Sequence, residues 1–252
     1  MKQKSYCHGL SQYALLGETI GDNLRDTCTR FSEREALIAV HQNYKATYKT
    51  FWQQVTAVAK AFLAINVEKG DRVALWSPNR YEWVLVQYAT ARIGAILVNI
   101  NPAYRKSELA YVLGQSGATV LISATSFKES DYKAMIEEVR SSCEELRRVI
   151  FFEEDWENFL SGANKITEVK LHEVENTLQF DDPINIQYTS GTTGFPKGVT
   201  LSHYNILNNG YFIGKRLAYT EKDKVCIPVP FYHCFGMVIG NLCCTSIGAC
   251  MV

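Results

Sequence analysis

Residues 188–203, YTSGTTGFPKGVTLSH, bring hydroxyl side chains, glycines and one lysine together in a short stretch. Glycine-rich turns expose backbone N–H groups, which form a concave site for an anion. Lys197, held between Pro196 and Gly198, adds a charge that can reach phosphate oxygens. Four hydroxyl side chains supply further donors: Thr189, Ser190, Thr192 and Thr193. The stretch predicts a polyphosphate-binding loop, and the alternative is a flexible polar hairpin loop.

Two familiar phosphate loops do not fit this stretch. The Walker loop needs G-x-x-x-x-G-K-[ST], whereas the pattern here is G-x-x-G-x-x-K-G, with no hydroxyl after the lysine. The dinucleotide fingerprint G-x-G-x-x-G opens a helix, but this loop runs into the β-branched GVTLS. We therefore expect a phosphate loop between two strands.

The composition is that of an ordinary globular protein with one large domain or two modest ones. The chain has 252 residues, of which 47% are hydrophobic, and its 26 basic residues balance its 26 acidic residues. Nucleic-acid binding is disfavoured, because contact with a phosphate backbone needs a basic excess or a basic patch.

The cysteines and the apolar runs indicate where the protein resides. Eight cysteines without a C-x-x-C pair point to a reducing compartment, and adjacent His233 and Cys234 lack the spacing of a zinc finger. The amino terminus has no signal-peptide core, and no stretch reaches the roughly 18 apolar residues of a membrane span. We expect a cytoplasmic protein with reduced thiols and no transmembrane segment.

Short apolar strands alternate with helical patterns along the chain. A hairpin is predicted at 35–40 and 44–48, helices at 50–65, 79–94, 105–117 and 129–142, and strands at 69–76, 95–100, 118–122, 147–152 and 183–190. Between 153 and 182 we expect one helix and an irregular connector. This order predicts an α/β fold of layered, mostly parallel sheets flanked by helices. One subdomain is expected over 1–175, and a second begins over 176–252.

The residues resemble the adenylate-forming enzymes, which include the acyl-CoA synthetases. The resemblance rests on YTSGTTGFPKGVTLSHYN, on residues 46–122, and on VPFYHCFGM at 229–237. NPAYRKSELAYVL together with DPINIQYTSGTTGFPKG is most similar to medium-chain fatty acyl-CoA synthetases. The resemblance implies that a carboxylate and ATP form an acyl adenylate, with Mg²⁺ accompanying the phosphates. The acyl group then passes to coenzyme A.

The resemblance also implies roles for individual residues. Lys197 and Thr193 are the expected catalytic residues. The expected nucleotide-binding residues are Thr189, Ser190, Gly191, Thr192, Thr193, Gly194, Phe195, Pro196 and Lys197. The expected residues for the carboxylic acid are Phe231, Tyr232, His233 and Gly236. His233 also has a purely structural interpretation, and His203 is expected to be a cap or packing residue.

Several parts of the family pattern have no counterpart in these residues. The Tyr-Gly-x-Thr-Glu motif, the ribose-binding aspartate, the Gly-Arg hinge and the carboxy-terminal domain with its lysine have no match. We therefore expect an incomplete fold, the amino-terminal part of a fatty acid–CoA ligase, inactive alone. Its activity would need the rest of the chain or a complementing carboxy-terminal polypeptide, and the expected macromolecular partners are such a polypeptide or a second copy in a homo-oligomer. The alternative is a non-catalytic nucleotide-binding module, or half of a split enzyme that pairs with another chain.

Overall fold

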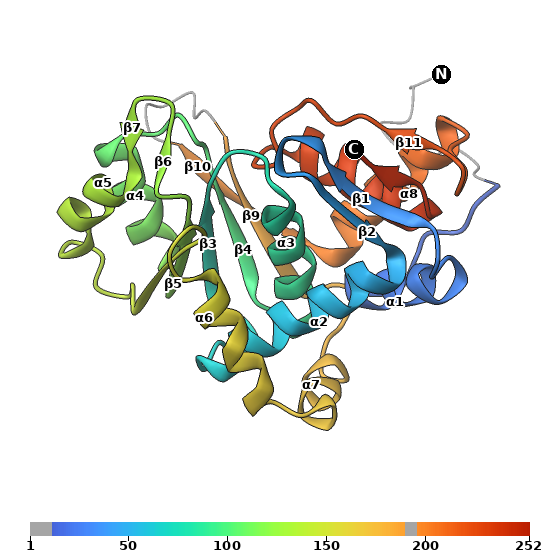
Figure 1. The fold of residues 1–252 in the computed structure, drawn as a ribbon, viewed down its shortest axis with the longest axis horizontal. Coiled ribbons are helices and arrows are strands. Elements are labelled where there is room, and N and C mark those ends of the chain that lie inside the picture. The colour runs from blue at the N-terminus through green and yellow to red at the C-terminus, as the bar shows by residue number, and fades with distance from the viewer. Residues whose placement is uncertain (1–11, 190–195) are drawn as a thin grey trace, which may run out of the picture.

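The structure, a computed structural model, describes residues 12–189 and 196–252. Within these residues the main feature is a six-stranded sheet in the order β10-β9-β4-β3-β5-β8, called the large sheet below (Figure 1). Its strands are β3 (Arg72–Trp76), β4 (Ile96–Ile100), β5 (Val120–Ser123), β8 (Arg148–Phe151), β9 (Pro183–Thr189) and β10 (Lys197–Ser202). Neighbouring strands from β9 to β8 are parallel, and β10 pairs with β9 antiparallel. The prediction of a mostly parallel sheet is confirmed.

The large sheet is covered on both faces, which explains its continuous apolar strands. Val73 and Leu75 pack into one hydrophobic cluster, and Ala74 and Trp76 pack into the other, because alternate side chains point to opposite faces. One face carries α2 (Tyr48–Ala64), α3 (Tyr81–Ile93) and α6 (Trp156–Ser161), and the other carries α4 (Lys106–Ser116) and α5 (Tyr132–Arg140) (Figure 1). The two helical layers hold the strands in place between them.

Local sequence signals set the ends of these helices. The Thr47 hydroxyl accepts a hydrogen bond from the backbone N–H of Thr50 and caps α2. Helix α3 ends at Gly94, whose φ of 71° lies in the left-handed region that glycine adopts most easily. A Cβ at this glycine would lie 2.6 Å from Leu178 Cδ2, so the turn into β4 also requires the missing side chain. The predicted helix end at Gly94 is confirmed.

A small sheet lies beside the large one, with the order β11-β12-β1-β2 among the described residues (Figure 1). The predicted hairpin forms its antiparallel part, β1 (Glu35–Ala39) and β2 (Tyr44–Thr47), with η1 (Val40–Gln42) between them. Strands β11 (Lys224–Val225) and β12 (Cys250–Met251) join it in parallel. Each sheet therefore contains strands from both sides of residue 175, where the subdomain boundary is expected.

Some elements were not predicted from the sequence. These are α1 (Ile20–Arg30), the short pair β6 (Ser126–Phe127) and β7 (Ser130–Asp131), and a second helix in the expected irregular connector, α7 (Glu168–Glu175), which follows η2 (Gly162–Lys165). Further along, α8 (His203–Arg216) precedes a π-helix, η3 (Phe235–Leu242), and α9 (Cys243–Ile247). A π-helix is rare and is often found at functional sites.

A buried arginine holds the connector against the helical layer. The Arg92 guanidinium, on a side chain only 1% exposed, lies 2.7 Å from Glu175 Oε1 and donates to the Thr56 hydroxyl at 2.6 Å. It also lies 3.7 Å from the ring centroid of Trp52. Arg92 of α3 thus contacts both α2, through Thr56, and α7, through Glu175. Separating these helices would leave a buried charge without its partner, which is costly.

His203 connects the start of α8 to the start of α1. Its Nδ1 accepts a hydrogen bond from the Ile20 backbone N–H at 3.1 Å, which satisfies one of the free donors at that helix end. Burial lowers the pKa of His203 to about 4, although the nearby Asp182 and Asp22 carboxylates act in the opposite direction. The expected packing role is thus confirmed, and the imidazole is neutral in the folded protein.

Neither a membrane span nor a metal site is found in the part of the chain that the structure describes. No helix of residues 12–189 and 196–252 is long and apolar enough to cross a membrane. The same residues contain no group of three or more His, Cys, Asp and Glu side chains that could hold a metal ion.

We predict that His203 makes the protein less stable in acid. The unfolded chain takes up a proton near pH 6.5, whereas the folded protein does not until about pH 4. Stability is therefore lost as the pH falls between these values, by about 2 kcal/mol at pH 5 from this residue alone. Urea unfolding at pH 7.5 and pH 5 should show a smaller acid loss in His203→Gln than in wild type. His41→Gln, at an exposed position, is the control. Equal acid losses in wild type and His203→Gln would contradict this.

A second prediction concerns the thiols. The described cysteines are free. Cys226 is exposed, Cys234 is half-buried, and five are buried: Cys28, Cys143, Cys243, Cys244 and Cys250. Burial raises the pKa of Cys243 and Cys250 to about 11, which disfavours the reactive thiolate. Iodoacetamide should therefore alkylate Cys226 of the folded protein before the buried five, and should reach those five only after denaturation without reductant. Peptide mapping by mass spectrometry measures this, and an unlabelled pair in denatured protein would argue for a disulfide.

Candidate functional site

The predicted phosphate loop connects two paired strands. Thr189 at the end of β9 and Lys197 at the start of β10 are register partners, so the two ends of the loop lie side by side. This confirms the expected position between strands. Six of the expected nucleotide-binding residues lie outside the described residues: Ser190, Gly191, Thr192, Thr193, Gly194 and Phe195. The structure thus fixes the base of the loop through Thr189, Pro196 and Lys197.

The base of the loop is tied to the helical layer beneath it. The Tyr111 hydroxyl of α4 donates to the Pro196 carbonyl oxygen at 3.0 Å. A Cβ at Gly198 would lie 3.2 Å from Ile186 Cγ2 and close to the Tyr188 ring, so the strands approach closely here. Lys197 is exposed. A cationic side chain on a fixed backbone, beside the Thr189 hydroxyl, suits phosphate oxygens, which take a charged donor readily.

The second motif, residues 229–237, forms a tight turn that opens into η3. The Gly236 backbone N–H donates to the His233 carbonyl oxygen at 2.9 Å. A Cβ at Gly236 would collide with the Pro230 carbonyl oxygen, so the turn requires glycine. The exposed His233 accepts at Nδ1 from the Phe235 N–H at 3.1 Å, which leaves its Nε2 as the protonated nitrogen. That nitrogen can donate to an oxygen atom such as that of a carboxylate.

Asn79 holds the beginning of this turn against the start of α3. Its Nδ2 donates to the Val229 carbonyl oxygen at 2.9 Å, and its Oδ1 accepts from the Phe231 N–H at 2.8 Å. The Phe231 ring packs 5.5 Å from the Trp83 ring, between centroids, and is buried. Asn79 lies 150 residues before Val229 in the sequence, and its two hydrogen bonds hold the backbone on either side of Pro230, so only the fold reveals its role.

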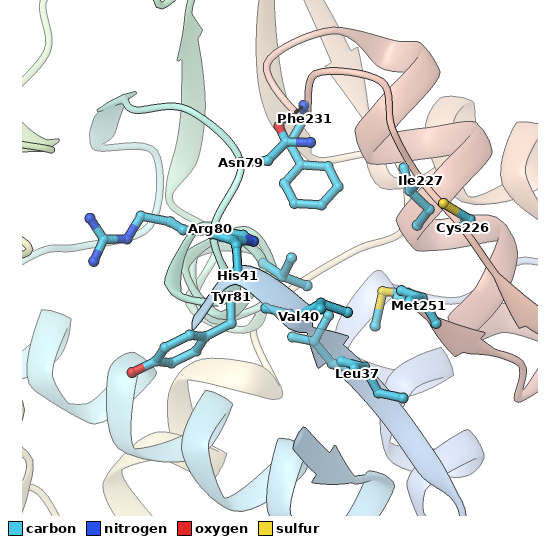
Figure 2. Close-up of a pocket in the computed structure, with 14 residues that line it drawn as sticks. Leu37, Val40, His41, Asn79, Arg80, Tyr81, Cys226, Ile227, Phe231 and Met251 are labelled. Carbon is cyan, nitrogen blue, oxygen red and sulfur yellow. Dashed lines mark hydrogen bonds between the residues drawn. The ribbon is translucent and has the colours of Figure 1, made fainter. Parts of the chain in front are cut away.

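An apolar cavity of about 270 Å³ lies beside Phe231, which forms part of its wall (Figure 2). Its walls come from β1, the start of α3, residues 226–227 and β12. The Arg80 guanidinium and the Tyr81 ring point away from it, since Arg80 pairs with Glu82 and Tyr81 stacks on Tyr44. Among the residues expected to contact the acid, Phe231 lines this cavity, whereas Tyr232, His233 and Gly236 do not.

Two amide side chains at the carboxyl ends of the strands bring the two motifs together. Asn99 of β4 donates through Nδ2 to the Tyr232 carbonyl oxygen at 3.1 Å and to Met237 Sδ at 3.0 Å. Gln187 of β9 donates through Nε2 to the same sulfur at 3.1 Å. In proteins with open parallel sheets, ligands bind beyond the carboxyl ends of the strands, and both motifs lie there.

Asn99 and Gln187 were missed in the sequence, although each left a signal. Each is a polar residue near the end of an otherwise apolar run, AILVNI for Asn99 and PINIQY for Gln187. A buried polar side chain needs hydrogen-bond partners, so such a residue marks a contact that the strand itself does not supply.

Comparison with known proteins places the chain in a family. Residues 24–252 match the AMP-binding enzyme family. The mitochondrial medium-chain acyl-CoA ligase ACSF2 of Danio rerio is 37% identical over 269 residues, which cover 98% of this chain and 44% of the relative. YngI of Bacillus subtilis, which is named as an acyl-CoA synthetase, is 38% identical over 94% of this chain and 47% of its own length. The chain thus spans about half the length of these relatives.

Solved structures share the fold. The N-terminal domain of FACL13 from Mycobacterium tuberculosis superposes with a TM-score of 0.79 at 24% identity, over 93% of this chain and 56% of that one. The anthranilate CoA ligase AuaEII, solved with anthranoyl-AMP, gives 0.80 at 23% identity, over 94% and 45%. The layered α/β fold is therefore that of the amino-terminal part of adenylate-forming enzymes, and the chain belongs to the AMP-binding enzyme family.

Proposed function

We propose that this chain is the amino-terminal portion of an ATP-dependent, AMP-forming acyl-CoA ligase that acts on medium-chain fatty acids. The observation that carries the proposal is the pair of amide contacts to Met237. They hold the turn that presents His233 at the sheet edge where the phosphate loop begins and ends. Family membership and the names of the relatives, which include medium-chain acyl-CoA ligases, support the same reaction.

On the nucleotide side, the chain would act mainly by neutralising charge. A carboxylate is a poor electrophile, and negative oxygens shield the α-phosphate from attack, so positioned cations and donors lower the barrier. We assign Lys197 and the Thr189 hydroxyl to the triphosphate, together with Thr193 and the rest of the loop by family resemblance. By family resemblance, Mg²⁺ would neutralise further phosphate charge.

On the acyl side, His233 is the residue best suited to meet the carboxylate. Its side chain is exposed and its Nε2 carries a proton, so it can donate to a carboxylate oxygen. Tyr232 is half-buried and can contact the acyl chain, whereas Phe231 and Gly236 are buried and shape the turn. Coenzyme A would accept the acyl group in the second step. The cytoplasmic location stays a prediction, and the ACSF2 relative is named as mitochondrial.

The second candidate is a non-catalytic nucleotide-binding module, or half of a split enzyme that pairs with another chain. The chain covers 44% of the Danio rerio relative and 47% of the Bacillus subtilis relative. The two candidates differ in whether supplying the rest of the relatives' length produces catalysis. We call this chain joined to the carboxy-terminal portion of the Bacillus subtilis relative the completed enzyme.

We predict that Lys197→Ala slows adenylate formation in the completed enzyme. Loss of one charge that stabilises the transition state should lower the rate by about 10- to 1000-fold. Exchange of labelled pyrophosphate into ATP measures this step with a medium-chain acid present. The control is Lys222→Ala, at another exposed lysine far along the chain from the loop, which should exchange at the wild-type rate. Near-normal exchange in Lys197→Ala would make this lysine an ordinary surface charge.

We also predict that the 252-residue chain alone forms no acyl-CoA. Its recognisable contacts are to the phosphate end of ATP, and a nucleotide held at one end loses the positioning that lowers the barrier. Purified chain should therefore bind ATP and GTP with similar, weak affinity. Incubation with ATP, Mg²⁺, coenzyme A and octanoate should release no AMP above background. Turnover that persists after removal of host synthetases would contradict the prediction.

A further inference from the structure

Buried amide side chains line the contact between the large sheet, α3 and η3. We call this set the amide row, and its members are Gln87, Asn99, Asn185, Gln187 and Asn241. Each is 6% exposed or less. Asn185 and Gln187 share one face of β9 with Thr189, because alternate strand residues point the same way. The amide row therefore runs along the strand face toward the end of the strand where the phosphate loop begins.

The amide row converges on Met237. Its Sδ accepts hydrogen bonds from Asn99 Nδ2 at 3.0 Å and from Gln187 Nε2 at 3.1 Å. Its carbonyl oxygen accepts from Gln87 Nε2 at 3.1 Å. A thioether sulfur is a weak acceptor, so two amide donors on one sulfur are a poor way to stabilise a core. Ordinary packing would place apolar side chains at these positions, as Leu97 does on the same face of β4.

Both ends of the turn that carries His233 are held by these contacts. At one end, the Tyr232 carbonyl oxygen accepts from Asn99 Nδ2 at 3.1 Å. At the other end, the Met237 backbone N–H donates to the His233 carbonyl oxygen at 3.1 Å, while its sulfur is held by Gln187 and Asn99. The position of the imidazole thus depends on two amides of the large sheet.

The same amides are close along the chain to the phosphate loop. Gln187 is two residues before Thr189, and Thr189 is the register partner of Lys197. Asn99 is the register partner of Gln187 on the neighbouring strand and accepts from Asn185 Nδ2 at 3.1 Å. A short path of paired backbone and hydrogen bonds therefore joins Lys197 to His233 through Gln187 and Met237.

We propose that Gln187 and Asn99 are positioning residues which, through Met237, fix the acyl-binding turn relative to the base of the phosphate loop. This inference rests on the proposed function, in which both motifs act in the same reaction. Adenylate formation joins a carboxylate oxygen to the α-phosphate, so the two substrates must be held at a set separation. A displacement of about 1 Å can reduce such a rate by about 100-fold.

The first test measures the coupling in this chain and needs no activity. Met237→Leu keeps the volume of the side chain and removes the sulfur acceptor. In backbone amide NMR spectra it should shift the signals of Thr189 and Lys197. The matched control is Met135→Leu, at a buried methionine in the other hydrophobic cluster, which should leave both signals in place.

A double-variant cycle then assigns the path of the coupling. In the Gln187→Leu background, Met237→Leu should no longer shift the Lys197 signal, since the hydrogen bond that carries the effect is already absent. An equal shift with and without Gln187, or an equal shift in the Met135→Leu control, would overturn the proposal. Asn99→Leu provides a second background in which the path from β4 is removed, so the test survives a Gln187 variant that does not fold.

The second test uses the completed enzyme and separates positioning from binding. Met237→Leu and Gln187→Leu should each lower kcat for pyrophosphate exchange by about 10- to 100-fold, with KM for ATP changed by less than about threefold. The double variant should be no slower than the worse single variant, because both remove the same contact. Multiplying effects, or a change confined to KM, would overturn the proposal.

The two proposals fail in different ways. A wild-type completed enzyme that is folded but exchanges no pyrophosphate with any medium-chain acid would contradict the proposed function. The NMR cycle would still decide whether Gln187 and Met237 couple the two motifs. Active wild type with unshifted Lys197 signals in Met237→Leu would contradict the positioning role alone.

Discussion

Burial of both faces of the large sheet is the constraint on which the rest of the structure depends. Its strands can carry polar side chains only where another polar group meets them, since an unpaired buried amide costs about 1–3 kcal/mol. The Asn185 Nδ2 meets this demand by donating to the Leu97 carbonyl oxygen at 2.8 Å and to Asn99 Oδ1 at 3.1 Å, whereas the Asn185 Oδ1 has no partner among the described residues. Chemistry is therefore confined to the carboxyl ends of the strands. There β9 leads into the phosphate loop, and η3 brings the second motif against the sheet.

Much of the fold could be predicted because apolar strands and helix ends have local causes. Strands buried on both faces must be apolar throughout, and Gly94 marks a left-handed backbone position that few other residues adopt easily. Helix α1 and the second helix of the connector could not be predicted in the same way. They depend on distant partners, His203 for the start of α1 and Arg92 for Glu175 at the end of α7. Such contacts leave no periodic pattern in the sequence.

The candidate site was predictable in part for a similar reason. A loop rich in glycine and hydroxyls next to Lys197 predicts a phosphate ligand, and the structure adds that its two ends lie side by side on β9 and β10. The acyl motif was found by resemblance, but the residues that hold it were not. Asn79, Asn99 and Gln187 act from other elements, and their spacing from the motif is set by the fold. No pattern in the residues indicated that η3 is a π-helix. In this helix Gly240 packs against Ile227 and leaves no room for a Cβ.

Strand β10 differs from the rest of the large sheet in ways that bear on motion. Among the described residues it is paired on one side only, as β8 is at the other edge, but unlike β8 its first four residues are all exposed. Few buried contacts are lost when such an edge separates, so the free energy of its local opening lies well below that of global unfolding. A transient opening of β10 would therefore carry Lys197 away from the sheet, while the parallel strands, and the amides that hold the second motif, stay in place. The exposed strand that carries Lys197 thus opens at a lower free energy than the buried strands beside it.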